Sequence, residues 1–153
     1  MNKIVYVAAG VGLSATLVVA PARAASIEWS GTTDQQAYLV QPYVFFDVLT
    51  SSHQVNAFGG QLGLACGAST SHDVPKSIGV AGGGQWVHAS IRRGSFRFSF
   101  AQDGGRFTGR GHFTSRHHAV GTIRYVVTSA SVPGGHCDSG LVHWSATPGN
   151  HNY

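Results

Sequence analysis

The stretch GSFRFSFAQDGGRFTGRGHF, residues 94–113, constrains the fold of this chain more than any other. In its first half every second residue is phenylalanine and the residues between are serine or arginine, which is the period-two pattern of a half-buried strand. The DGG at residues 103–105 predicts a tight hairpin turn, because glycine accepts the positive φ that such turns demand. In the returning strand Phe107 and Phe113 share a face with two glycines. We therefore expect an antiparallel hairpin with aromatic residues on its core face.

The rest of the chain has the same character. Glycine, aromatic and β-branched residues dominate, with 21 glycines, whereas leucine, lysine and glutamate are scarce, so the composition favours sheet over helix. Further strands are expected at Ser26–Gly31, Ala37–Gln41, Tyr43–Leu49, Val55–Cys66 and Ala119–Thr128, with one or two short ones within residues 78–91 and a polar loop at Gly67–Ser77. Eight or nine short strands predict a single antiparallel β-sandwich with little helix, and a closed β-barrel is the alternative.

The first 24 residues read as a secretory signal peptide. A single lysine near the start is followed by an apolar run from Ile4 to Ala20 and by the small-residue site Ala22-Arg23-Ala24. The alternative is an uncleaved membrane anchor, for which the run is at the low end of the required length and is interrupted by small and polar residues. We expect cleavage after Ala24, leaving residues 25–153 as one domain that is secreted or associated with the cell envelope and has no membrane span.

The charge of the chain argues against a nucleic-acid partner. The whole sequence has ten Lys and Arg against six Asp and Glu, and two of the basic residues, Lys3 and Arg23, leave with the signal peptide. Eight basic and six acidic residues remain, a net charge of +2, which is too small for a surface that depends on clustered positive charge. Seven of the eight are arginines between Arg92 and Arg124, and we interpret them as a solvated strand face.

Only two cysteines occur, Cys66 and Cys137. In an oxidising compartment an even pair 71 positions apart most simply forms one disulfide. Closing a loop of that length removes about 4.4 kcal/mol of unfolded-state entropy in the chain-entropy model. A two-cysteine metal site is the alternative, although neither cysteine has a C-x-x-C partner.

The segment GGHCDSGLVHWSA, residues 134–146, raises the question of a catalytic serine. Its CDSG differs by one residue from the GDSG around the nucleophile of trypsin-like proteases, but Cys137 replaces the first glycine and Leu141 stands where a further glycine is expected. A G-x-S-x-G elbow is absent as well, so we assign no catalytic residue. Cys137 and Trp144 are seven residues apart, which puts them on opposite faces of a regular strand. If both are buried on one side, a bulge near Gly140 is predicted.

A resemblance covers the whole chain after residue 24. The segments WSGTT at 29–33, RGSFRFSF, GRFTGRGHF, AVGTIRY and the terminal CDSGLVHWSA occur in that order. The chain resembles a class of small secreted bacterial domains, frequent in actinobacteria, whose pattern ends in Cys-x-Ser/Thr-Gly-x-x-x-Trp-x-Ala. The matching residues are Cys137, Ser139, Gly140, Trp144 and Ala146. The resemblance implies an extracytoplasmic β-domain with one cysteine pair, and it brings no catalytic residues with it.

Two kinds of polar residue could still carry chemistry. Asp47 lies in the apolar segment YVFFDVL, so it must either face solvent or have a partner. Of the nine histidines, His112, His117 and His118 are weak candidates for metal ligands, because one ends a strand and the other two occupy the next turn. We interpret the histidines as polar surface residues and expect no metal or other cofactor. A small secreted hydrolase or metalloenzyme that uses Asp47 and histidines is the alternative function.

Exposed aromatic residues are the remaining means of binding. Trp29, Trp86 and Tyr43 are possible ligand contacts, since such rings stack on sugars or on partner surfaces. The sequence therefore favours a non-enzymatic extracellular module that binds a ligand or a cell-surface component.

Overall fold

The computed structural model describes residues 25–36, 41–79 and 87–149, and it is almost entirely β-sheet. The strands are β1 (Ser26–Thr33), β2 (Tyr43–Leu49), β3 (Gln54–Cys66), β4 (Val74–Gly79), β5 (Ala89–Ser90), β6 (Ser95–Gln102), β7 (Gly105–Ser115), β8 (His118–Thr128), β9 (His136–Asp138) and β10 (Val142–Pro148). Among the described residues the only helix is one 3-10 turn at Pro133–Gly135. The predicted signal peptide and nearly all of the strand expected at Ala37–Gln41 lie outside these residues.

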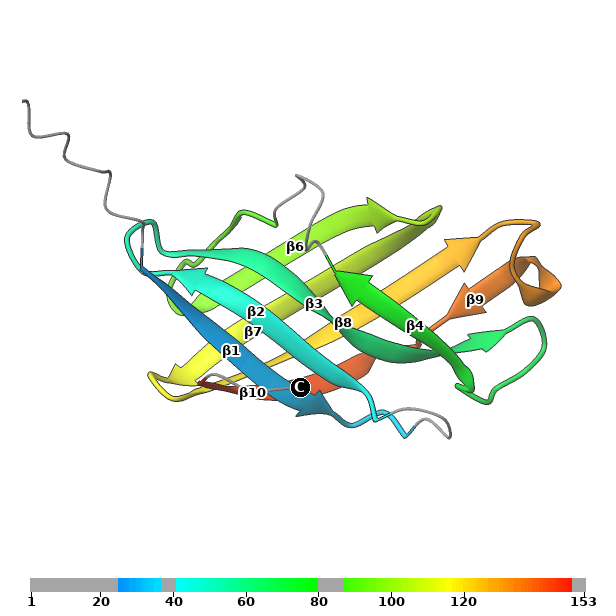
Figure 1. Cartoon of the computed structure of the whole chain (residues 1–153), viewed down its shortest axis with the longest axis horizontal. Helices are drawn as coiled ribbons and strands as arrows, with labels where there is room; N and C mark the ends of the chain where they lie inside the picture. Colours follow the sequence, from blue (N-terminus) through cyan, green and yellow to red (C-terminus); the bar gives the residue numbers. More distant parts are fainter. Residues whose placement is uncertain (1–24, 37–40, 80–86, 150–153) are drawn as a thin grey trace, which may run out of the picture.

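Six of the strands close into a ring. All strand pairs are antiparallel, and the order is β10-β1-β2-β3-β9-β8-β7-β6, with a further pairing of β10 to β8 that joins the ends of the ring. β7 and β6 continue outward from β8, and β4 and β5 pair with β3. In Figure 1, β1–β4 form a front layer whose strands cross those of β6–β8 behind it. The antiparallel all-β prediction is confirmed, and the ring corresponds to the barrel that was the alternative to a sandwich.

Aromatic side chains fill the space between the layers. Phe46 of β2 is fully buried and lies at the centre, with its ring centroid 5.7 Å from that of Phe58 on β3 and 5.6 Å from that of Trp144 on β10. Phe96 of β6 approaches the same ring from the other layer at 5.7 Å. Each buried ring contributes roughly 1.5–3 kcal/mol by removing apolar surface from water, so this cluster is the main force that holds the two layers together.

Glycines on the inner side of β7 and β8 make room for these rings. A Cβ placed on Gly121 would lie 2.3 Å from Cζ2 of Trp144 and 2.1 Å from the backbone oxygen of Arg110. Gly111, directly opposite Gly121 in the sheet, lies under the ring of Phe96 in the same way. The rings of Phe96 and Phe98 on β6 therefore lie over glycines of the neighbouring strand β7 on the inner face of the sheet.

The β6–β7 hairpin has the turn that the sequence predicts. Asp103 and Gly104 both have positive φ, 48° and 76°, as a two-residue type I′ turn requires, and Gln102 pairs with Gly105. The prediction of a polar loop over Gly67–Ser77 is wrong for its last four residues, because Val74–Ser77 belong to β4, which pairs with β3. This strand contains Pro75 and Lys76, which are typical of an edge strand. Because it lacks a regular alternation of apolar and polar residues, the sequence pattern does not predict it.

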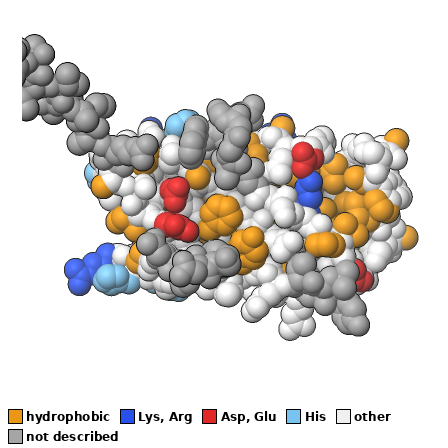
Figure 2. All heavy atoms as spheres, in the orientation of Figure 1, with side chains coloured by type: hydrophobic (Ala, Val, Ile, Leu, Met, Phe, Trp, Pro, Cys, Tyr) orange, Lys and Arg blue, Asp and Glu red, His pale blue; other side chains and the backbone are white. Residues whose placement is uncertain are grey.

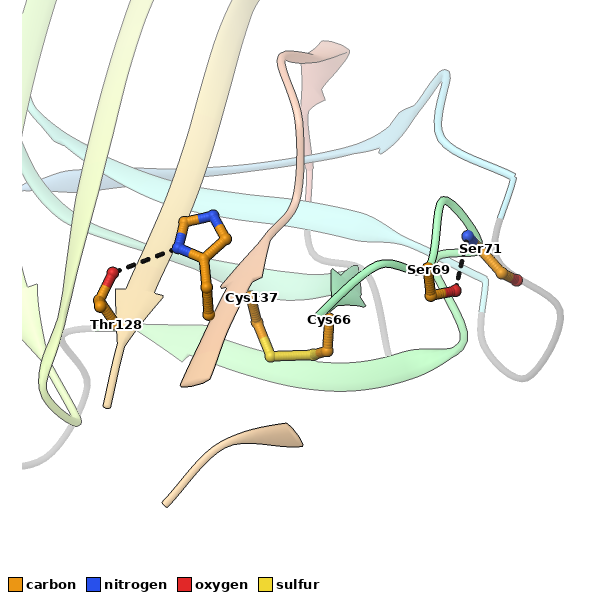
Figure 3. The surroundings of a disulfide bond; sticks show 6 residues. Cys66, Ser69, Ser71, Thr128 and Cys137 are labelled. Carbon is orange, nitrogen blue, oxygen red and sulfur yellow. Dashed lines mark hydrogen bonds between the residues drawn. A yellow bond between two sulfur atoms is a disulfide. The ribbon is translucent and has the colours of Figure 1, made fainter. Parts of the chain in front are cut away.

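The disulfide and the bulge are both where the sequence places them. Cys66 of β3 and Cys137 of β9 are bonded, with Cα atoms 4.1 Å apart, beside Thr128 of β8 (Figure 3). Cys137 and Trp144 are both buried, 2% and 3% exposed. Asp138 pairs with Val126 and Val142 pairs with Ile123, so the chain has one extra residue against β8 around Gly140, whose φ is 68°, and the predicted bulge is confirmed.

No helix in the described part of the chain is long and apolar enough to cross a membrane. A disulfide of this kind is typical of proteins that fold in an oxidising compartment.

Candidate functional site

The outward face of β6, β7 and β8 is rich in arginine. The phenylalanines of β6 point inward, so the residues between them, Ser95, Arg97 and Ser99, are exposed. The hairpin register then places Arg97 of β6 directly opposite Arg110 of β7. Directly opposed residues have Cβ atoms about 4.5–5.5 Å apart, so two positive side chains leave the sheet side by side.

A tight turn adds a third arginine to this face. Arg92 and Ser95 exchange both backbone hydrogen bonds, at 2.8 and 2.9 Å, across a turn in which Arg93 and Gly94 have φ of 50° and 75°. This is again the pattern of a type I′ turn. It places Arg92 beside Ser95, and Ser95 in turn lies opposite His112.

These side chains surround a hollow of about 570 Å³, which we call the arginine pocket. Its walls carry Arg92, Arg97, Arg110 and His112, and its remaining lining is Ser90, Ser95, Phe96, Gly111, Val120 and Gly121. The His112 ring is held in place by a 2.9 Å hydrogen bond between its Nδ1 and the Ser95 hydroxyl. Arg110 is exposed, and its Nε donates to the Thr122 hydroxyl at 3.1 Å, which orients the guanidinium group.

A second hollow of about 350 Å³ adjoins the arginine pocket along the strands, and we call it the threonine hollow. Arg97 and Arg110 line both hollows, and the second also contains the hydroxyl-bearing Thr108 and Thr122. The two opposed arginines therefore stand at the boundary between the hollows, and a group bound to them can be reached from either side.

The three arginines of the pocket, unlike Arg124 on the same face, are not neutralised by carboxylates in the described part of the chain. Among the described residues, the carboxylate partners found in ion pairs are Asp34, Asp103 and Asp138, and none of them pairs with Arg92, Arg97 or Arg110. Asp138 is bound to Arg124, whose Nε donates to it at 3.0 Å and whose hydrogen bonds lower the pKa of the Asp138 carboxyl. The pocket thus combines opposed, solvent-facing guanidinium groups with no internal counter-charge.

The structure places two of the three aromatic residues that were predicted to contact a ligand. Trp29 is only 4% exposed and stacks on Phe46 with ring centroids 5.7 Å apart, so its assignment as a ligand contact is corrected: it is a core residue. Tyr43 is half-buried and lines a separate hollow of about 460 Å³ beside Ser30, Thr32 and His118. Trp86 lies outside the described residues.

The candidate metal ligands do not come together. His112 is bonded to Ser95, the Nδ1 of His118 is 2.8 Å from the Thr114 hydroxyl, and His117 is exposed in the β7–β8 turn. In the ranges that the structure describes, no three His, Cys, Asp or Glu side chains are grouped so that they could hold a metal ion.

Asp47 lies on the outer side of β2, directly opposite Glu28 of β1. Partial burial, and then the charge of Glu28, raise the pKa of the Asp47 carboxyl. Figure 2 shows acidic side chains together over β1 and β2, with Lys and Arg seen mainly at the rim of this view. Asp47 lines none of the three hollows described above.

Ser139 is built into the sheet at the bulge. Its side chain is buried, its Oγ accepts a 2.9 Å hydrogen bond from the backbone N–H of Tyr125, and its hydroxyl donates to the carbonyl of Gly140 at 2.9 Å. The Gln35 side chain adds to this junction, because its amide nitrogen donates to the carbonyls of Ser139 and of Gly63 on β3. The serine that resembles a nucleophile therefore acts as a strand partner.

The arginine pocket is absent from the sequence-based candidates, which assign the arginines to a solvated face. One signal in the sequence could have found it. A two-residue turn at Asp103-Gly104 fixes the pairing of the hairpin, and counting back from it brings Arg97 opposite Arg110. Comparison of the chain with protein-family models, with curated proteins and with solved structures gives no match.

Proposed function

We propose that this protein is a non-enzymatic, extracytoplasmic binding domain that holds an anionic ligand in the arginine pocket. The observation that carries the proposal is the directly opposed pair Arg97 and Arg110, which lacks a carboxylate partner among the described residues. Like charges placed directly opposite each other destabilise a sheet. An oxyanion between the two guanidinium groups replaces this repulsion by charge-assisted hydrogen bonds.

The use of arginine supports an oxyanion as the ligand. Guanidinium is planar and presents its donors in a fork that matches carboxylate, phosphate or sulfate oxygens in pairs. Ser95 and Thr122 hold His112 and Arg110 in place before any ligand arrives, which reduces the entropy that binding would otherwise cost.

Location outside the cytoplasm is supported by separate features. The Cys66–Cys137 disulfide suits an oxidising compartment. The first 24 residues have the order of a secretory signal peptide, and the resemblance to small secreted actinobacterial domains supports the same location. We take the mature protein to be residues 25–153.

The enzyme alternative finds less support. A hydrolase that uses Asp47 and histidines would bring several of these side chains to one hollow. The arginine pocket contains one of them, His112, and the hollow beside Tyr43 contains one other, His118.

The test is anion binding by the purified protein and by variants. Thermal unfolding is measured in sulfate and in chloride at equal ionic strength, because a ligand that binds only the folded state raises its stability. We expect sulfate to raise the Tm of the wild type more than that of the Arg97→Gln/Arg110→Gln variant, since the general stabilising effect of sulfate is common to both. Arg116→Gln, which removes one exposed arginine of the β7–β8 turn, is the control for loss of a surface charge away from the pocket and should behave like the wild type. Equal sulfate effects on all three proteins would refute the proposal.

A further inference from the structure

The positive face extends well beyond the arginine pocket. From Arg92 at one end, the exposed arginines continue through the Arg97–Arg110 pair to Arg106, which lies opposite Ala101 near the other end of the hairpin. Ser95 and Ala101 are six positions apart on β6, which corresponds to about 20 Å at the rise of an antiparallel strand. A single small oxyanion occupies only a fraction of this length.

The two hollows lie along this row of exposed arginines, which we call the track, and both are lined by the pair at its centre. Because Arg97 and Arg110 line both the arginine pocket and the threonine hollow, a ligand bound at the pair can continue in either direction. Arg106 has no carboxylate partner among the described residues, and its Nη1 donates to the Ser99 hydroxyl at 3.1 Å. The charges therefore form a row along the strands.

The side chains between the charges indicate what kind of polymer fits. Ser95, Ser99, Thr108 and Thr122 interleave with the arginines on the outer face and offer hydroxyl groups. None of the outward positions of β6, β7 and β8, all of which are described, is phenylalanine, tyrosine or tryptophan, so the face offers no platform on which nucleic-acid bases could stack. Its apolar side chains are few, which does not suit insertion into lipid.

We infer that the occupant of this face is a linear acidic glycan, whose anionic groups bind the row of arginines while its hydroxyls bind the serines and threonines. The inference rests on the proposed function, because it takes the anion at Arg97 and Arg110 to be one charged group of a longer chain. The alternating arginine and hydroxyl side chains match a polymer that alternates anionic and hydroxyl groups.

The experiment compares ligands of increasing length. Binding of galacturonate oligomers with one, two, four and six sugars is measured by isothermal titration calorimetry or NMR titration, with maltohexaose as the uncharged control and inorganic polyphosphate as a charged chain without sugars. The affinity should rise at least about tenfold from the dimer to the hexamer, because each further charged group binds at high effective concentration. Maltohexaose should bind far more weakly than the acidic hexamer.

Variants distinguish anion binding in the arginine pocket from glycan binding along the whole row of arginines. Arg106→Gln should lower the affinity for the hexamer several-fold and leave sulfate binding unchanged, whereas Arg97→Gln/Arg110→Gln should abolish both. Arg116→Gln removes one positive charge, as Arg106→Gln does, and is the control for that variant. Arg97, Arg106 and Arg110 are all exposed, so these variants are expected to fold. Near-UV circular dichroism verifies this.

Each other outcome has a distinct meaning. If sulfate binds but affinity does not grow with glycan length, the anion pocket stands and the glycan inference is wrong. Tight binding of polyphosphate without binding of galacturonate oligomers would overturn the glycan in favour of a phosphate polymer. If neither sulfate nor any charged polymer binds, both the inference and the proposed function fail.

Discussion

Replacement of Ser139 by alanine should destabilise the protein although it deletes a single oxygen atom. The Ser139 Oγ accepts a 2.9 Å hydrogen bond from the backbone N–H of Tyr125. Ser139 lies at the bulge between the end of β9 and the start of β10. Both residues are buried, with Ser139 2% and Tyr125 1% exposed. Alanine at position 139 leaves this N–H without an acceptor in a place that water does not reach.

The expected loss follows from that geometry. A buried donor left without an acceptor costs about 1–3 kcal/mol, well above the value of an average exposed hydrogen bond. In a domain of this size each 1 kcal/mol lowers Tm by roughly 3–5 °C. The backbone bond from the N–H of Ser139 to the carbonyl of Tyr125, 3.0 Å long, does not depend on the side chain and should survive.

Urea unfolding followed by tryptophan fluorescence measures this loss, because Trp29 and Trp144 are both buried in the core. The midpoint should fall at constant m-value, since the surface exposed on unfolding does not change. Ser145→Ala, at an exposed position on β10, is the matched control and should stay within about 0.5 kcal/mol of the wild type. Hydrogen exchange should also show reduced protection of the Tyr125 amide in Ser139→Ala. Equal stability of the two variants would refute the structural role of this serine.

Three further changes test the fold and its charges. Removing the disulfide by replacing both cysteines with alanine should cost up to about 4.4 kcal/mol in urea unfolding, since the bond closes a loop of 71 residues. Asp47→Asn should raise stability at pH 7 by a few tenths to about 1 kcal/mol, because partial burial and the opposed Glu28 penalise the ionised carboxyl. The raised pKa of Asp47 means that this gain should shrink in a pH series as the wild-type carboxyl becomes protonated, and vanish below about pH 4. Gly121→Ala should cost about 2–3 kcal/mol or prevent folding, since its Cβ would lie 2.3 Å from Trp144 and 2.1 Å from the Arg110 carbonyl oxygen, and expression yield with urea unfolding measures this.

The hairpins and single strands of this fold are predictable because their signals are local. The bounds expected for Tyr43–Leu49 agree with β2, and the turn at residues 103–104 sets the register of β6 and β7. The bulge at Gly140 follows from parity once Cys137 and Trp144 are buried on the same side, because two residues an odd number apart cannot share a face of a regular strand.

The closure of the ring is not predictable in this way. β1 pairs with β10 and β10 pairs with β8, so the first and last strands meet through contacts that no local pattern records. The same limit explains Trp29. The alternation of side chains along β1 shows which residues share a side with Trp29, but not which side faces the core. Trp29 is in the core because its ring packs against Phe46 and Phe113, which belong to other strands.

The total charge of the chain conceals the proposed binding face. A net charge of +2 for residues 25–153 describes a weakly basic protein, and on that ground the arginines look like scattered solvated residues. The fold separates the charges, however: Glu28 and Asp47 lie opposite each other over β1 and β2, whereas Arg97 and Arg110 lie opposite each other on the outward face of β6 and β7. Electrostatic attraction acts within about 8–10 Å in physiological salt, so a ligand at the hairpin responds to the local arginines and hardly to distant carboxylates. The pairing register, rather than the total charge, therefore decides whether these residues can bind an anion.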